Sequence, residues 1–258
     1  MPRDRSLNAF SLEGKVALVT GASRGLGRAI AEGLASAGAD VVCSSSRAGG
    51  ARDTTAAIRA LGRKAWELNA DVSDRPALLA MADAAEREAG AIHILVNNAG
   101  TIRRAPAADY SFDDWDHVLR TNLDSVFVLS QRLGRRMIER RAGKIINIAS
   151  LLSFTGGVLV PAYTASKHAL AGLTKALANE WAPHGIQVNG VAPGYFITDN
   201  TQELRDTPAK EREITSRIPA GRWGNPSDVA GAVVFLASAA SDYVNGHILT
   251  VDGGWSAR

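Results

Sequence analysis

The chain has 258 residues, 46% of them hydrophobic and 21% charged, which suffices to bury the core of one large domain. A single cysteine and five histidines without metal-ligand spacing exclude a disulfide-rich scaffold and a structural zinc site. The 29 basic and 26 acidic residues leave a net charge of only +3, which excludes the strongly basic balance of a nucleic-acid-binding domain.

Apolar, β-branched segments alternate with amphipathic stretches along the chain. Strands are predicted at 15–20, 40–44, 65–69, 92–97, 144–149, 186–191 and 247–251. Helices are predicted between them at 25–37, 54–61, 75–89, 113–140 and 164–181. Most of the strands are almost continuously apolar, as strands buried on both faces of a parallel sheet are. The pattern predicts an α/β fold, a single doubly wound Rossmann-type sheet of about seven parallel strands with helices on both faces.

The domain organisation predicted from composition is simple. An N-terminal tail at residues 1–11 precedes one domain at 12–258, and a segment at 193–226, rich in Thr, Pro and charge, is expected to form an irregular lid. No apolar run approaches the ~18 residues of a membrane span, and the polar start has no signal-peptide core. We therefore expect a cytoplasmic protein that binds neither a membrane nor a nucleic acid.

A glycine-rich turn follows the first predicted strand. Gly21, Gly25 and Gly27 open the next helix and allow backbone amides to approach a pyrophosphate. An NAD-selective site would carry an acidic residue after the second strand, where this chain has 44–47 (Ser-Ser-Ser-Arg). These hydroxyls and Arg47, with Arg24 from the glycine turn, suit a 2′-phosphate. The sequence thus predicts a preference for NADP(H) over NAD(H); the alternative is that both arginines are solvated loop residues.

A second set of residues predicts acid–base chemistry. Tyr163 and Lys167 lie four residues apart on one face of a predicted helix, and Ser150 follows the fifth predicted strand. An ammonium ~4 Å from a phenol favours the phenolate by about 4 kcal/mol at an effective dielectric constant near 20. That energy corresponds to roughly three pKa units, so we expect a lowered pKa for Tyr163 and a role as general acid/base.

The chain also has Asp71–Val72 after the third predicted strand, Asn97–Gly100 after the fourth, Asn122 and Pro193–Gly194. Together with the motifs above, these residues make the chain similar to the short-chain dehydrogenase/reductase family over about residues 12–255. The resemblance implies an NAD(P)-dependent oxidoreductase in which Tyr163 exchanges a proton with the substrate oxygen and Ser150 hydrogen-bonds that oxygen. It also implies that Lys167 holds the nicotinamide ribose and lowers the pKa of Tyr163, and that Asn122 anchors a water. The implied coenzyme site comprises Gly21, Ser23, Arg24, Gly25, Leu26, Gly27, Ser45, Ser46, Arg47, Asp71, Val72, Asn98, Ala99, Gly100, Tyr163, Lys167, Pro193, Gly194, Phe196 and Thr198.

Longer segments indicate the substrate. Residues 97–104 (NNAGTIRR), 150–167, 192–201, 218–224 and 251–255 resemble the subgroup of 2-dehydro-3-deoxy-D-gluconate 5-dehydrogenases, also called 2-deoxy-D-gluconate 3-dehydrogenases. This resemblance implies interconversion of a ketone and a secondary alcohol on a sugar acid, and relatives imply a homotetramer assembled through 113–140 and 163–181. Only six of the 29 basic residues are lysine. A substrate carboxylate suits an arginine partner, for which the candidates are Arg103, Arg104, Arg217 and Arg222; for each, a surface or inter-subunit salt bridge is the alternative.

Two other functions remain open from the sequence. One is a 3-oxoacyl-carrier-protein reductase or another carbonyl reductase, which shares parts of the same segments. The other, of a different class, is a nucleotide-sensing regulator without turnover. Such regulators typically lack the tyrosine or the lysine, so the presence of Asn122, Ser150, Tyr163 and Lys167 together favours an enzyme.

Overall fold

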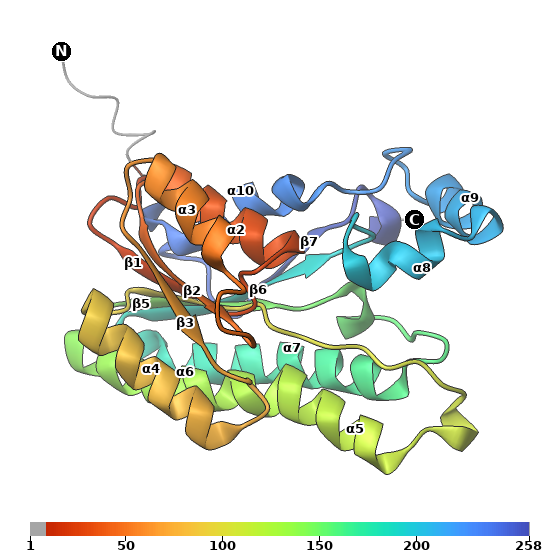
Figure 1. Ribbon diagram of the computed structural model, residues 1–258, viewed down its shortest axis with the longest axis horizontal. Helices are drawn as coiled ribbons and strands as arrows, with labels where there is room; N and C mark the ends of the chain where they lie inside the picture. The colour runs from red at the N-terminus through yellow and green to blue at the C-terminus, as the bar shows by residue number, and fades with distance from the viewer. Residues whose placement is uncertain (1–8, 258) are drawn as a thin grey trace.

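The structure, a computed structural model, describes residues 9–257, so most of the predicted N-terminal tail lies outside the described residues. It contains one seven-stranded parallel sheet with strand order β3-β2-β1-β4-β5-β6-β7 (Figure 1). The predicted α/β class and the seven predicted strands are confirmed, with ends that differ by at most two residues. The strands are β1 (Val16–Val19), β2 (Asp40–Ser45), β3 (Ala65–Asn69), β4 (Ile94–Asn97), β5 (Gly143–Ile148), β6 (Ile186–Pro193) and β7 (Ile248–Val251).

Helices cover both faces of the sheet, and Figure 1 shows α2, α3 and α10 on one face and α4, α5, α6 and α7 on the other. Alternate strand residues face opposite layers, since Ala17 and Val19 join the core beneath α2 while Leu18 joins the core beneath α4 and α6. The helices are α2 (Gly25–Ser36), α3 (Arg52–Ala60), α4 (Arg75–Ala89), α5 (Phe112–Leu119), α6 (Ser125–Arg140), α7 (Pro161–Trp181), α8 (Gln202–Arg205), α9 (Pro208–Arg217) and α10 (Ala230–Ala237).

Two predicted segments differ from the structure. The single helix expected at 113–140 is divided by a π-helical turn, Arg120–Asp124, a feature often found at functional sites. The segment at 193–226 is not irregular, because it contains α8 and α9. Its helical turns pack on a small apolar cluster of Ile214, Ile218 and Trp223, a cluster too short to show a helical period in the sequence.

The topology brings several loops to one edge of the sheet. Strand order runs outward from β1 to β3 on one side and from β4 to β7 on the other, so the chain changes direction between β1 and β4. Ligands of doubly wound sheets bind outside the carboxyl ends of the strands at such a switch point. The glycine turn after β1 and the Asn98–Gly100 loop after β4 meet here.

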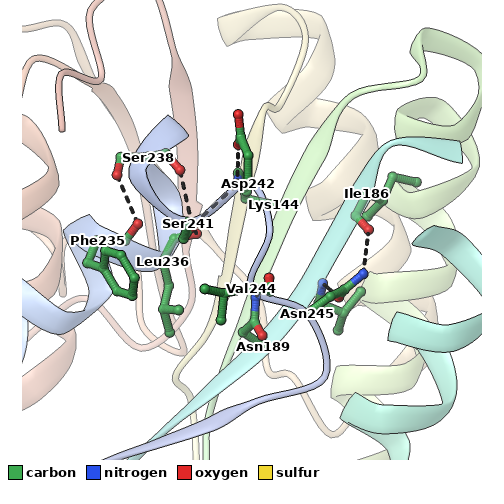
Figure 2. Close-up of polar contacts among 11 residues, drawn as sticks. Lys144, Ile186, Asn189, Phe235, Leu236, Ser238, Ser241, Asp242, Val244 and Asn245 are labelled. Atoms are coloured by element: carbon green, nitrogen blue, oxygen red, sulfur yellow. Dashed lines mark hydrogen bonds and ion pairs between the residues drawn. The ribbon is translucent and has the colours of Figure 1, made fainter. Parts of the chain in front are cut away.

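The edge strand β7 pairs with β6, and two asparagines hold the connection that precedes it (Figure 2). Asn245 accepts a hydrogen bond from the backbone N–H of Val188 at 2.8 Å and donates to the carbonyl oxygen of Ile186 at 3.2 Å. Asn189 donates to the carbonyl oxygen of Val244 at 2.8 Å. The connection before β7 is therefore tied to β6, which places the residues after β7 close to the segment that follows β6.

Candidate active site

A cavity of about 690 Å³ lies at the carboxyl ends of the strands. Every residue predicted to bind the coenzyme lines it, as do Ser150 and Arg103. Sequence reasoning missed eight lining residues. Some of them directly precede or follow a predicted residue at a strand end and could have been found on that ground, whereas His117 and Thr121 come from α5 and the π-helical turn, where no motif marks them. The eight are Ala70, His117, Thr121, Ile148, Ala149, Asp199, Asn200 and Thr201.

The glycine turn has the conformation that its residues allow. Gly21 and Gly25 adopt positive φ angles of 66° and 55°. A Cβ at Gly27 would collide with the carbonyl oxygen of Gly21 and the amide of Asn98, so only glycine fits between them. Within the described chain, α2 has no side-chain N-cap and no acidic residue in its first turn. Its free amides and positive helix end therefore suit an anionic ligand such as a pyrophosphate.

Hydroxyl groups gather at the end of β2. The Ser44 side chain is 1% exposed, and its Oγ has no hydrogen-bond partner among the residues that the structure describes. The Ser45 hydroxyl donates to the carbonyl oxygen of Arg47 at 2.7 Å and holds the turn in which Ser46 and Arg47 are exposed. The exposed Ser46 hydroxyl and Arg47 guanidinium of this turn line the cavity and suit a polar, anionic ligand such as a ribose with a 2′-phosphate.

The proposed catalytic side chains meet at the cavity wall formed by β5 and α7. Ser150 lies two residues after the end of β5, and Tyr163 and Lys167 come from the first two turns of α7. Lys167 is 5% exposed, and its Nζ donates to the carbonyl oxygen of Ile148 at 2.7 Å. The same Nζ lies 5.6 Å from the centre of the Tyr163 ring. The three side chains are thus brought together as predicted.

The expected lowering of the pKa of Tyr163 is not found in this structure. Burial raises the pKa of Tyr163, although the Ser150 hydroxyl and the Arg104 cation act in the opposite direction. Burial also lowers the pKa of Lys167 to about 8. The sequence argument placed a full ammonium beside the phenol, whereas the structure turns Nζ toward a carbonyl oxygen in a site where burial disfavours both charged forms.

Asn122 lies behind the cavity and not in its lining. It is 1% exposed and sits in the π-helical turn. Its Oδ1 accepts from the N–H of Thr101 at 2.8 Å, and its Nδ2 donates to the Thr101 carbonyl at 2.9 Å and to Ser166 Oγ at 3.2 Å. Asn122 therefore joins the loop after β4 to α7 one residue before Lys167. The water-anchoring role stays a prediction.

The four candidate arginines separate into two pairs. Arg103 lines the cavity, and Arg104 lies close enough for its charge to act on Tyr163. Arg217 stacks 4.3 Å above the Trp255 ring, and Arg222 pairs with Asp228 at 2.6 Å. Of the four, only Arg103 lines the cavity in the described structure, whereas Arg104, Arg217 and Arg222 do not. The geometry therefore brings Arg103 and Arg104, but not the other two, toward the site.

Other reactive groups are few in the described part of the chain. No cluster of three or more His, Cys, Asp and Glu side chains among residues 9–257 could hold a metal ion. Cys43 is buried on β2, where burial raises the pKa of its thiol to about 12. None of the described helices is both long enough and apolar enough to cross a membrane.

Known proteins resemble the chain over nearly its whole length. Residues 21–256 match the family described as Enoyl-(Acyl carrier protein) reductase. The 2-dehydro-3-deoxy-D-gluconate 5-dehydrogenase of Bacillus subtilis is 55% identical over 97% of this chain and 98% of that protein. The enzyme of the same name from Escherichia coli is 53% identical over 98% of this chain and 99% of that protein.

A solved structure shows the same architecture. The gluconate 5-dehydrogenase from Burkholderia cenocepacia, in complex with NADP and tartrate, superposes with a TM-score of 0.94 at 44% identity, over 98% of this chain and 99% of that one. The resemblance inferred from short motifs therefore extends to the full sequence and to the three-dimensional fold. The chain belongs to the short-chain dehydrogenase/reductase family.

Proposed function

We propose that the chain is an NADP(H)-dependent oxidoreductase that interconverts a ketone and a secondary alcohol on a sugar acid of the 2-dehydro-3-deoxy-gluconate type. The observation that carries the proposal is the position of Ser150, Tyr163 and Lys167 in the same cavity as the glycine turn. The names of the two relatives above support the sugar-acid class. So does the hydroxy acid tartrate bound by the Burkholderia enzyme.

The chain's own residues account for the proton chemistry. The coenzyme, when bound, supplies or accepts the hydride. In ketone reduction the Tyr163 hydroxyl gives its proton to the carbonyl oxygen, and in alcohol oxidation the tyrosinate takes the proton from the alcohol. Ser150 donates a hydrogen bond that holds the same oxygen. Burial lowers the pKa of Lys167 to about 8, so this side chain beside Tyr163 changes its charge close to neutral pH.

The coenzyme preference rests on the end of β2. The buried Ser44 hydroxyl, the turn held by Ser45, and the exposed Ser46 and Arg47 stand where an NAD-selective site carries a carboxylate. Arg24 lines the same cavity from the glycine turn. A guanidinium forms bidentate, charge-assisted hydrogen bonds with a phosphate, so this set favours NADP(H).

For the substrate carboxylate we assign Arg104 as the partner, with Arg103 as the second candidate. The Arg104 guanidinium acts on the pKa of Tyr163, so a sugar acid whose ketone oxygen meets Tyr163 can place its carboxylate nearby. Its Nη2 donates to the carbonyl oxygen of Asn200, a residue of the cavity lining, at 3.1 Å. Arg103 is engaged by Asp114 at 3.3 Å.

A cytoplasmic homotetramer completes the proposal. The predicted contact helices carry exposed aromatic side chains, since Phe112 on α5 is 88% exposed and Phe127 on α6 is 44% exposed. Large apolar side chains that face water on a helical surface often mark an interface between subunits. Light scattering of the purified protein should give four times the monomer mass.

Coenzyme oxidation and reduction, followed by nicotinamide absorbance, test the activity. The panel contains 2-dehydro-3-deoxy-gluconate, 2-deoxy-gluconate, gluconate and a β-ketoacyl thioester, each with both coenzymes. We expect turnover of the sugar acids with NADP(H). Preferred turnover of the thioester would replace the proposal by an acyl reductase, and tight coenzyme binding without any turnover would favour the regulator.

A further inference from the structure

The outer wall of the cavity is a short segment after β6, residues 198–201, which we call the strap. All four of its residues line the cavity. Thr198 lies against the glycine turn, because a Cβ built on Gly25 would be 3.6 Å from Thr198 Cγ2. The Thr201 hydroxyl donates to the carbonyl oxygen of Phe196 at 2.6 Å, and Arg205 donates to that of Thr198 at 3.1 Å. The strap is thus a hydrogen-bonded turn that packs against the glycine turn.

An ion pair joins the strap to the glycine turn. Arg24 Nη1 lies 3.0 Å from Asp199 Oδ2, and the two side chains are 76% and 66% exposed. Both residues of the pair line the cavity. Asp71, the other carboxylate in the lining, accepts from the N–H and the hydroxyl of Ser73 at 2.9 and 2.7 Å. Asp199 is therefore the carboxylate that faces the arginine expected at the 2′-phosphate.

We infer that Asp199 competes with the 2′-phosphate of NADP(H) for Arg24 and so limits the selectivity for NADP(H) over NAD(H). The inference rests on the proposed function, in which Arg24 contacts that phosphate. A phosphate that approaches Arg24 either displaces Asp199 or lies beside its negative charge, and both outcomes weaken binding. NAD(H) lacks the phosphate and leaves the pair intact.

The size of the expected effect on coenzyme binding follows from the exposure of the Arg24 and Asp199 side chains. Exposed ion pairs contribute ~0.2–1 kcal/mol, which corresponds to about a 1.4- to 5-fold change in a dissociation constant. The pair is weak enough for a bound phosphate to replace it and strong enough for its removal to be measured. Its effect should decrease at high salt, because charges this exposed are screened.

Calorimetric titration of NADPH and NADH into the full-length protein tests the inference without turnover. For Asp199→Asn we expect the dissociation constant of NADPH to fall about two- to fivefold at low salt, with a smaller change for NADH. Glu203→Gln is the matched control, since it removes one negative charge from an exposed residue of α8 that does not line the cavity. It should leave the NADPH-to-NADH ratio unchanged.

Arg24→Ala separates competition from a general charge effect. In that background, Asp199→Asn should no longer change the ratio of the two dissociation constants. An unchanged ratio for Asp199→Asn alone, or the same change with and without Arg24, would overturn the inference while the proposed function stands. A wild-type protein that binds neither coenzyme would overturn both.

Discussion

The cavity wall carried by the sheet and the wall formed by the strap hold their polar groups in different ways. Behind the sheet wall, Asn97 donates to the Asn147 side chain at 2.9 Å, and Asn147 donates to Thr174 Oγ1 at 2.9 Å. All three side chains are at most 3% exposed. The strap is joined to the glycine turn by the Arg24–Asp199 pair, both of whose side chains are mostly exposed.

This difference matches what each wall is proposed to do. Proton transfer needs reacting atoms within a few tenths of an ångström of their productive positions, and a buried network of side-chain hydrogen bonds supplies that order. Ligand selection at the mouth requires groups that can exchange one partner for another, and exposed ion pairs do so at little cost. The comparison predicts large effects of changes on the sheet wall and smaller, salt-dependent effects of changes near the mouth.

The largest expected effect is that of Tyr163→Phe. Removal of the phenol hydroxyl eliminates the proton donor, so kcat for sugar-acid reduction should fall by at least ~10²–10⁴-fold. NADPH affinity should stay within a factor of about two, since the ring remains. Tyr243→Phe is the control, because Tyr243 is fully exposed and lies outside the cavity lining. A Tyr163→Phe enzyme with unaltered kcat would refute the acid–base assignment.

The pH dependence tests whether the sheet wall controls the reacting proton. Burial lowers the pKa of Lys167 to about 8 and raises that of Tyr163, so Lys167 is the one of the two that loses its proton near pH 8, while Tyr163 stays protonated there. Oxidation needs a proton acceptor, so its kcat/KM should rise with pH up to this value, and that of reduction should fall above it. Both limbs should resist added salt, because the groups are buried. Profiles that run in the same direction for both reactions would contradict this assignment.

The sheet wall could be predicted from sequence in more detail than the strap. Continuous apolar strands followed by glycine, asparagine or serine indicate a parallel sheet and the edge at which its ligand binds, since the loops that follow parallel strands all lie at the carboxyl ends of those strands. That logic placed Ser150, Asn98 and the glycine turn correctly. It also indicated the hydroxyls of residues 44–46, but not that the Ser44 hydroxyl is buried without a partner in the described structure, because that depends on how the end of β2 packs.

The features of the site that the sequence did not predict depend on tertiary packing. The strap and α9 lack a strong apolar period, and their helical turns are held by packing on Trp223 and by side-chain hydrogen bonds from Thr201. The pKa of Tyr163 depends on the direction of the Lys167 ammonium, which residue spacing does not specify. Likewise, only the fold separates Arg104 from Arg217, whose guanidinium is stacked on Trp255.

The next effect concerns the substrate carboxylate at the mouth. A charge-assisted hydrogen bond contributes ~1.5–3 kcal/mol, so Arg104→Ala should raise KM for the sugar acid about 10- to 100-fold, with a smaller change in kcat. Arg212→Ala on α9 removes the same charge from an exposed position outside the lining and should behave like the wild type. Arg103→Ala examines the second candidate. If neither variant at 103 or 104 changes KM, the carboxylate assignment is wrong.

A smaller effect, but larger than that of Asp199→Asn, is expected for Arg47→Asp on coenzyme choice. Arg47 is exposed, so water and salt screen its contact with the 2′-phosphate, and we expect the NADPH-to-NADH ratio of kcat/KM to fall about tenfold at low salt. A carboxylate at this position also offers an acceptor to an unphosphorylated ribose, so part of the change should come from better use of NADH. Because the sheet wall is untouched, kcat with saturating NADPH should stay near the wild-type value. An unchanged ratio would mean that the buried Ser44 hydroxyl and Arg24, rather than Arg47, distinguish the two coenzymes.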